Sequence, residues 1–131
     1  MELDHVGIAV ADLTRATGRW KLVAGEPDGP PEEVPSQGVR VAFLKAGSVG
    51  VELLEPTRPD SSVGRFLAKR GEGLHHLAFP VPSVEAALAD LVRRGERVVD
   101  HAARPGARGR KVGFAHPSAF GGVLVEFVEG A

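Results

Sequence analysis

The chain repeats itself at a nearly constant spacing. LDHVGIAVADLTRA, at residues 3–16, aligns with LHHLAFPVPSVEAA, at residues 74–87, at an offset of 71. The same offset aligns GVRVAF with GRKVGF, and an offset of 74 aligns VELLEP with VEFVEG near the end of each copy. Self-similarity at a fixed period is typical of repeated supersecondary units. We therefore expect two modules, at residues 1–60 and 73–131, within a single domain over residues 1–131.

Each module is predicted to contain a strand, a helix and then two or three further strands. Apolar residues alternate in HVGIAV and HLAFPV, which indicates a strand that packs one face against the following helix. In the second module that helix begins after Ser83, a suitable N-cap, and ends at Gly95. Its counterpart runs through Ala16 and Trp20, and a short helix ending at Gly71 separates the modules. Loops are expected in two Pro- and Gly-rich stretches, residues 25–35 and 104–109.

Composition narrows the classes of function. The 131 residues include 16 basic and 17 acidic side chains, and a net charge of −1 gives no overall field for nucleic acid or an anionic membrane. No apolar run reaches the roughly 18 residues that span a bilayer. The first residues lack the profile of a signal peptide, so we expect a cytoplasmic protein. The sequence has no cysteine, which leaves histidine and carboxylate side chains as metal ligands.

His5 and His76 occupy equivalent positions on the first strands of the two modules. A single histidine on an apolar strand would be explained more simply as a core residue. Strand alternation, however, places His5 on the face opposite the apolar residues, beside Gly7 and Ala9, and gives His76 equally small neighbours. We interpret this face as the lining of a cavity. The same alternation puts His75 on the other face or at the strand edge, which makes His76 the candidate ligand.

Glu52 and Glu126 are matching carboxylates on the closing strands of the two modules. Each is flanked by apolar residues, and a buried carboxylate is costly unless it is paired or bound to a cation. Either glutamate alone is explained at least as well by a strand with one face in solvent. Repetition favours a site between the modules with two histidine and two carboxylate ligands. Its members are His5, Glu52, His76 and Glu126.

These segments resemble the vicinal oxygen chelate (glyoxalase/bleomycin resistance/dioxygenase) superfamily and, within it, the methylmalonyl-CoA epimerase family. The likeness runs through DHVGIAVADL, QGVRVAFLKAG, VELLEPTRPDSSVGRFLAKRGEGLHHLAF, GARGRKVGFAHP and GGVLVEF, almost the whole chain. It implies an α+β fold in which two paired βαβββ modules form a curved eight-stranded mixed sheet around a metal site. It also implies a divalent metal ion on the four residues above, an acyl-CoA substrate and commonly a homodimer. Cobalt is the expected ion, with manganese, nickel, magnesium or zinc as alternatives.

The family reaction interconverts the (R) and (S) forms of methylmalonyl-CoA by moving the C2 proton between faces. A metal ion that chelates two substrate oxygens would stabilise the enolate, and each face needs an acid–base group. Glu126 resembles the family residue that is both ligand and base. The second base is open, because some relatives carry it where the QGV motif here places Val41. Glu52, Gln37 through a water, or a metal-bound water could replace it.

The remaining charged loop residues have two interpretations. Arg108, Arg110 and Lys111 could bind a carboxylate or phosphate, or form a solvated basic loop. We expect His116, in AHPSAFGG, to form a strand-end turn and His101 to lie at the surface.

Three other classes of protein in the same superfamily are alternatives. A lactoylglutathione lyase-like glyoxalase would use the same fold and ligand set, but the stretches between the ligands favour the epimerase. An extradiol-type dioxygenase uses two histidines and one carboxylate, so a fourth ligand at Glu52 argues against it. A non-catalytic ligand-binding module typically lacks the metal ligands altogether.

Overall fold

The computed structural model describes residues 2–130, which form two compact units. One unit comprises residues 5–75, and the other comprises residues 76–130 together with residues 2–4. Within the described residues, no helix combines the length and the apolar character that crossing a membrane requires.

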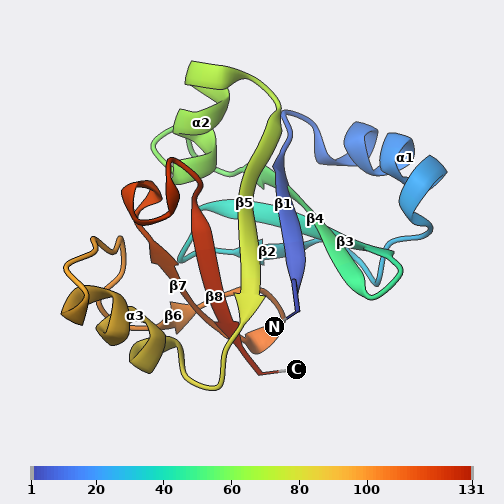
Figure 1. The fold of residues 1–131 in the computed structure, drawn as a ribbon. Helices are drawn as coiled ribbons and strands as arrows, with labels where there is room; N and C mark the ends of the chain where they lie inside the picture. The colour runs from blue at the N-terminus through green and yellow to red at the C-terminus, as the bar shows by residue number, and fades with distance from the viewer. Residues whose placement is uncertain (1, 131) are drawn as a thin grey trace. The chain divides into compact units, whose positions relative to one another are not determined.

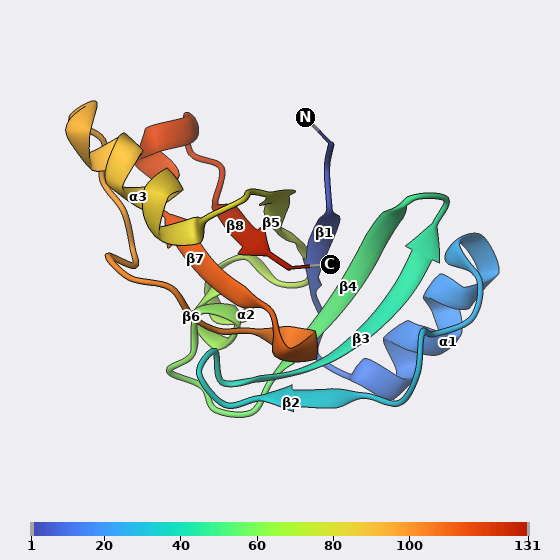
Figure 2. The same cartoon turned by 90° about the horizontal axis from the view of Figure 1, so that it is seen from below.

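The first unit contains four strands and two helices (Figure 1). They are β1 (His5–Ala9), α1 (Leu13–Ala24), β2 (Glu32–Val34), β3 (Val39–Ala46), β4 (Val49–Pro56) and α2 (Ser62–Arg70). The strand order is β2-β3-β4-β1, in which β1 is parallel to β4 and the other pairs are antiparallel. Figure 2 shows β3 and β4 as a long hairpin, with β2 running along β3.

The second unit repeats this arrangement. Its elements are β5 (Gly73–Pro80, which starts in the first unit), α3 (Val84–Arg93), β6 (Arg104–Pro105), β7 (Lys111–Ala115), β8 (Val125–Glu129) and two 3-10 turns (Ala107–Gly109, Pro117–Phe120). The strand order is β5-β8-β7-β6, with β5 parallel to β8 and the other pairs antiparallel. Both units thus follow the chain order βαβββ. The predicted α+β fold class with two βαβββ modules is confirmed.

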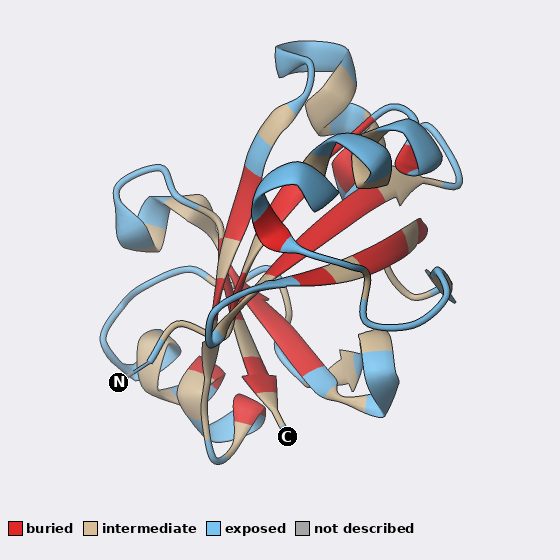
Figure 3. Ribbon diagram, turned by 90° about the vertical axis from the view of Figure 1, so that its right-hand side faces the viewer, coloured by how far each residue is buried: buried red, intermediate tan, exposed pale blue. Residues whose placement is uncertain are grey.

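Helix α1 packs on one face of the first sheet. Leu13 and Ala24, at its two ends, join Ile8, Leu44 and Leu53 in a buried apolar cluster. The predicted packing of alternate β1 residues against this helix is confirmed, because the cluster also contains the predicted residues Val6, Ile8, Val10, Ala16 and Trp20. Figure 3 shows the consequence: buried positions run along the strands, whereas much of the helix surface is exposed. The sheet face opposite α1, and the face opposite α3 in the second unit, are called the ligand faces below.

Helix α3 lies close to its sheet because β7 presents a glycine there. A Cβ atom on Gly113 would lie 2.8 Å from Leu88 Cδ1 and 2.8 Å from Val84 Cγ1. Ser83 caps the helix as predicted, accepting a hydrogen bond from the Ala86 N–H at 3.1 Å. The alternate residues expected to pack against this helix are only half-buried; they are Leu77 and Phe79 of β5 and Val81, which follows the strand.

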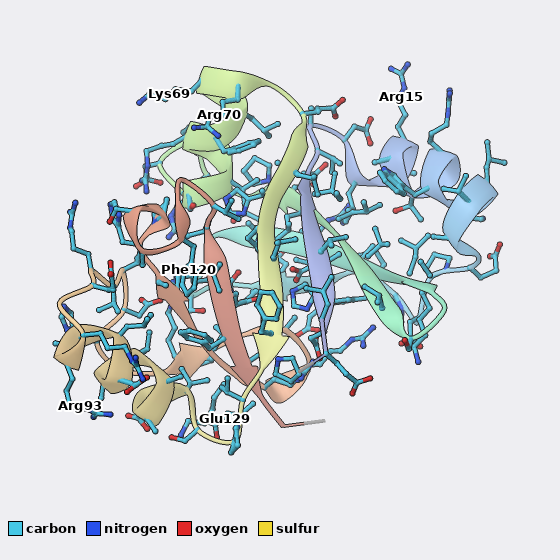
Figure 4. The ribbon with its side chains drawn as sticks, in the orientation of Figure 1. Arg15, Lys69, Arg70, Arg93, Phe120 and Glu129 are labelled. Carbon is cyan, nitrogen blue, oxygen red and sulfur yellow. The ribbon has the colours of Figure 1, made fainter. Side chains whose placement is uncertain are left out.

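The closing strand of each unit supplies a second cap to the main helix of that unit. Glu55 at the end of β4 accepts a hydrogen bond from the Leu13 N–H at 2.9 Å. Glu129 at the end of β8 accepts one from the Val84 N–H at 2.7 Å (Figure 4 labels Glu129). Carboxylates at helix N-termini satisfy free N–H groups and complement the helix dipole. This shared device explains why both copies of the repeat carry a glutamate at the end of the closing strand.

The expectation that residues 25–35 and 104–109 are entirely loop is wrong. Each stretch contains a short strand, β2 in the first and β6 in the second. Both are edge strands, where a proline without an N–H donor is tolerated because one side of the strand makes no ladder bonds. Prolines flank β2 and one lies within β6, and neither placement prevents a short edge strand.

Candidate metal centre

The ligand face of the first sheet holds a buried histidine and a buried glutamate. Strand register places Glu52 of β4 between Gly7 of β1 and Phe43 of β3. His5 Nε2 lies 3.2 Å from Glu52 Oε1, and the two side chains are only 5% and 6% exposed. The Phe43 ring meets the imidazole edge-on, with centroids 5.5 Å apart and an interplanar angle of 86°. The aromatic ring thus fixes the plane of the histidine.

The second unit builds the same arrangement. Glu126 of β8 is opposite Ala78 of β5 and Phe114 of β7. His76 Nε2 lies 3.3 Å from Glu126 Oε1, with side chains 1% and 4% exposed. The Phe114 ring meets the His76 imidazole at 5.5 Å and 88°. The repeat in the sequence is therefore a repeat of a three-residue structure: histidine, glutamate and phenylalanine.

Burial decides between the two interpretations of the glutamates. Neither points into solvent, because Glu52 and Glu126 are 5% and 3% exposed. An ionised carboxylate at such positions is costly to desolvate unless a cation or a donor compensates it. Two ligands of one ion, each at about 2.0–2.2 Å, are separated by about 2.8–3.6 Å at ordinary coordination angles. The nitrogen–oxygen separations of 3.2 and 3.3 Å fit this range.

The chemistry of the donors fits a divalent metal ion. The two pairs supply imidazole nitrogens and carboxylate oxygens, and this buried His-Glu-His-Glu group could hold such an ion. Imidazole and carboxylate together suit borderline and hard divalent ions. The four residues are those that the sequence analysis named as candidate ligands.

His75 lies apart from the ligand faces, as strand alternation predicted. Its Nε2 is 3.2 Å from Ser62 Oγ on α2, and its ring meets Phe66 edge-on at 5.2 Å. Within the first unit these contacts attach α2 to the start of β5. His75 thus has a structural role beside the candidate ligand His76.

The residues considered in connection with the second base lie in different surroundings. Val41 is 1% exposed and carries no ionisable group. Gln37 lies in the turn between β2 and β3, where its N–H donates to the Val34 carbonyl at 3.0 Å. Glu52 is paired with His5.

The basic loop residues take different positions. Arg110 donates two hydrogen bonds of 3.0 Å to the Asp4 carboxylate, a bidentate pair that engages its guanidinium. Arg108 is exposed and adopts a left-handed conformation with φ 62°. Lys111 lies 3.6 Å from Glu85 at the surface. Because Arg110 is engaged by Asp4, it is not available as the central residue of an anion site formed by these three side chains.

Two predictions for the other histidines are confirmed. His116 caps the turn Pro117–Phe120 by accepting a hydrogen bond from the Ser118 N–H at 3.0 Å. His101 is exposed. Sequence reasoning missed the role of Phe43 and Phe114, although the aligned GVRVAF and GRKVGF segments contain both residues and carried the signal.

Comparison with known proteins gives a consistent result. Residues 4–114 match the model of the Glyoxalase/Bleomycin resistance protein/Dioxygenase superfamily. The chain is 41% identical over 125 residues to the mitochondrial methylmalonyl-CoA epimerase of Bos taurus, covering 95% of this chain and 71% of the relative. It is 37% identical over 126 residues to the ethylmalonyl-CoA/methylmalonyl-CoA epimerase of Cereibacter sphaeroides, covering 95% and 94%.

A solved structure shows the same similarity in three dimensions. A variant of Streptomyces coelicolor methylmalonyl-CoA epimerase, in complex with 2-nitronate-propionyl-CoA, has a TM-score of 0.92 and 41% sequence identity. The match covers 100% of this chain and 95% of that chain. The predicted vicinal oxygen chelate fold is confirmed by this similarity.

Proposed function

The chain belongs to the Glyoxalase/Bleomycin resistance protein/Dioxygenase superfamily, and on that premise we propose that it is a metal-dependent epimerase that interconverts (R)- and (S)-methylmalonyl-CoA. The observation that carries the proposal is the occurrence of two equivalent buried pairs, His5–Glu52 and His76–Glu126. Relatives at 37–41% identity are named as epimerases of this substrate class. The similar solved structure binds an acyl-CoA analogue, which supports an acyl-CoA ligand here.

We propose that the two pairs are ligands of one divalent ion. One histidine and one carboxylate alone would supply only two ligands, whereas the two pairs together would supply four. Cobalt is the ion we propose first, and manganese, nickel, magnesium and zinc are the alternatives. When bound, the ion supplies positive charge that stabilises the negative charge developing on substrate oxygens.

The chain's own residues orient the ligands and move the proton. The edge-on rings of Phe43 and Phe114 hold the two imidazoles. When the C2–H bond breaks, the electron pair passes into the thioester carbonyl and C2 becomes planar, so a proton can return to either face. We assign Glu126 as the acid–base residue on one face and Glu52 primarily as a ligand. Burial of both carboxylates excludes bulk water from this step.

A homodimer is proposed on the family resemblance. Leu22 and Val23, near the end of α1, are each 77% exposed and give the chain apolar surface that a second copy would cover. Light scattering after gel filtration is expected to give twice the 13.8 kDa of one chain. A mass of one chain at micromolar concentration would contradict the dimer.

The proposed reaction is tested by proton exchange with solvent. Cobalt-loaded protein is incubated with (S)-methylmalonyl-CoA in deuterium oxide, with metal-free protein as the control. We expect deuterium at C2 together with loss of optical purity, and neither in the control. Retention of both the C2 proton and the optical purity by the loaded protein would contradict the proposed function.

A further inference from the structure

The register of β2 places a carboxylate beside Val41. Glu32 on β2 is directly opposite Val41 on β3. Directly opposed residues of an antiparallel pair point to the same face, with Cβ atoms about 4.5–5.5 Å apart. Val41 and Phe43 are two residues apart on β3 and share a face, and Phe43 is opposite Glu52. Glu32 therefore belongs to the ligand face of the first sheet.

This face is covered, whereas the other face of β2 is open. Val34, Val39 and Val41 are 4%, 1% and 1% exposed. Glu32 is half-buried among them, and its neighbour Glu33, on the opposite face, is exposed. Glu32 thus lies at the edge of the ligand face and is neither fully buried nor fully exposed.

The second unit places an arginine at the equivalent register position. Arg104 on β6 is opposite Val112 on β7, and Val112 is the repeat partner of Val41 at the offset of 71. The Arg104 guanidinium carbon lies 5.5 Å from the centre of the Phe114 ring. Phe114 is the ring that contacts His76. The Arg104 side chain therefore lies on the ligand face and reaches the phenylalanine beside the histidine, so this register position belongs to the face that carries the candidate ligands.

We propose that Glu32 is the second acid–base residue of the epimerase, in place of the glutamate that Val41 replaces. The inference rests on the proposed function. From one epimer, Glu32 takes the C2 proton, the C–H electron pair passes into the thioester carbonyl, and Glu126 gives a proton to the opposite face. From the other epimer the two carboxyl groups exchange roles. Proton exchange with solvent returns both groups to their starting states.

The test compares Glu32→Gln with Glu33→Gln, its neighbour on the opposite face of the same strand. Each variant is loaded with cobalt, its metal content is measured, and each epimer is incubated separately in deuterium oxide. For Glu32→Gln we expect full metal content and a loss of epimerisation of about 10²–10⁴-fold. Deuterium incorporation at C2 is expected to fall by the same factor from one epimer and to persist from the other. Glu33→Gln is expected to stay within about twofold of the unmodified protein, as for surface substitutions.

A conservative variant separates proton transfer from structure. Glu32→Asp keeps a proton acceptor and is expected to retain clearly more epimerase activity than Glu32→Gln. The proposal is overturned if Glu32→Gln epimerises as fast as Glu33→Gln. It is also overturned if deuterium incorporation falls equally from both epimers, or if Glu32→Asp is as inactive as Glu32→Gln. Failure of the unmodified protein to exchange C2 hydrogen would instead contradict the proposed function itself.

Discussion

Each unit contains a buried histidine–glutamate pair of the same geometry, but the residues on the neighbouring edge strand differ between the units. The His–Glu separations of 3.2 and 3.3 Å and the His–Phe centroid distances of 5.5 Å agree between the units. At the edge strands the units diverge, because Glu32 occupies the position on β2 that Arg104 occupies on β6. The geometry of the candidate ligands is thus the same in both units. The side chain at the equivalent edge position is acidic in the first unit and basic in the second. The first unit therefore offers a carboxylate at this edge position, and the second unit offers a guanidinium.

The helix faces of the two sheets also differ. Ala42 and Leu44 of β3 lie in the cluster under α1, and their repeat partners at an offset of 71 are Gly113 and Ala115. The smaller pair lets α3 lie against β7 with no room for another methyl group. The strand under α1 therefore contributes larger side chains to the packing, whereas the strand under α3 contributes smaller ones and lets the helix lie close.

The largest expected effect distinguishes the two adjacent histidines. His76→Ala removes an imidazole 3.3 Å from Glu126, so we expect metal affinity to fall by more than the roughly 10–100-fold that loss of an outer-shell partner costs. His75→Ala removes the contacts with Ser62 and Phe66 and is expected to lower stability by about 1–3 kcal/mol while leaving metal binding intact. Calorimetric metal titration and urea unfolding measure both effects. Equal loss of metal in the two variants would refute the assignment by strand face.

The next effect distinguishes the two glutamates. Glu126→Gln keeps an oxygen donor but removes the proton acceptor, so we expect most of the metal to stay and turnover to fall by about 10²–10⁴-fold. Glu52→Gln is expected to be milder, because the family resemblance implies that an oxygen ligand is enough there. Epimerisation rates at matched metal occupancy measure the difference. Equal inactivity of the two variants would make Glu52 an acid–base residue.

Added methyl groups test the packing difference between the helices. Gly113→Ala places a Cβ atom 2.8 Å from two side chains of α3 and is expected to destabilise the protein by about 1–3 kcal/mol. Gly18→Ala on α1, where nothing lies within 4 Å, is expected to stabilise it by about 0.5–1 kcal/mol. Urea unfolding gives both values. The same sign for both substitutions would contradict the packing described for α3.

The smallest effects test what the two units share. Glu55→Gln and Glu129→Gln each weaken a carboxylate cap on a helix N-terminus. Each is expected to lower the free energy of unfolding by about 0.3–1 kcal/mol, as is typical of charges at helix ends. Similar losses at low salt that shrink at high salt would support equivalent caps. A loss confined to one unit would show that the caps are not equivalent.

Local sequence patterns predicted the elements that carry strong periodicity. The alternation in HVGIAV placed His5 opposite the helix-packed residues, and Ser83 marked the start of α3. The repeat pairs His5 with His76 and Glu52 with Glu126 from the sequence alone. These features depend on residues close in sequence or on direct comparison of the two copies.

The pairing register of the strands and the short edge strands could not be predicted from local sequence patterns. Whether Glu32 lies opposite Val41 depends on how β2 pairs with β3, and the prolines around β2 favour a loop when only local propensity is considered. The ion pair of Arg110 with Asp4 joins residues 106 positions apart. No local pattern encodes either contact, because each is set by the arrangement of strands.

We propose that the two His–Glu pairs hold one ion and not two. Cobalt titration of the metal-free protein by calorimetry tests this claim, with two double variants as comparisons, His5→Ala with Glu52→Ala and His76→Ala with Glu126→Ala. We expect one ion per chain for the unmodified protein and no tight binding in either double variant. Two ions per chain, or one tightly bound ion in either double variant, would contradict it.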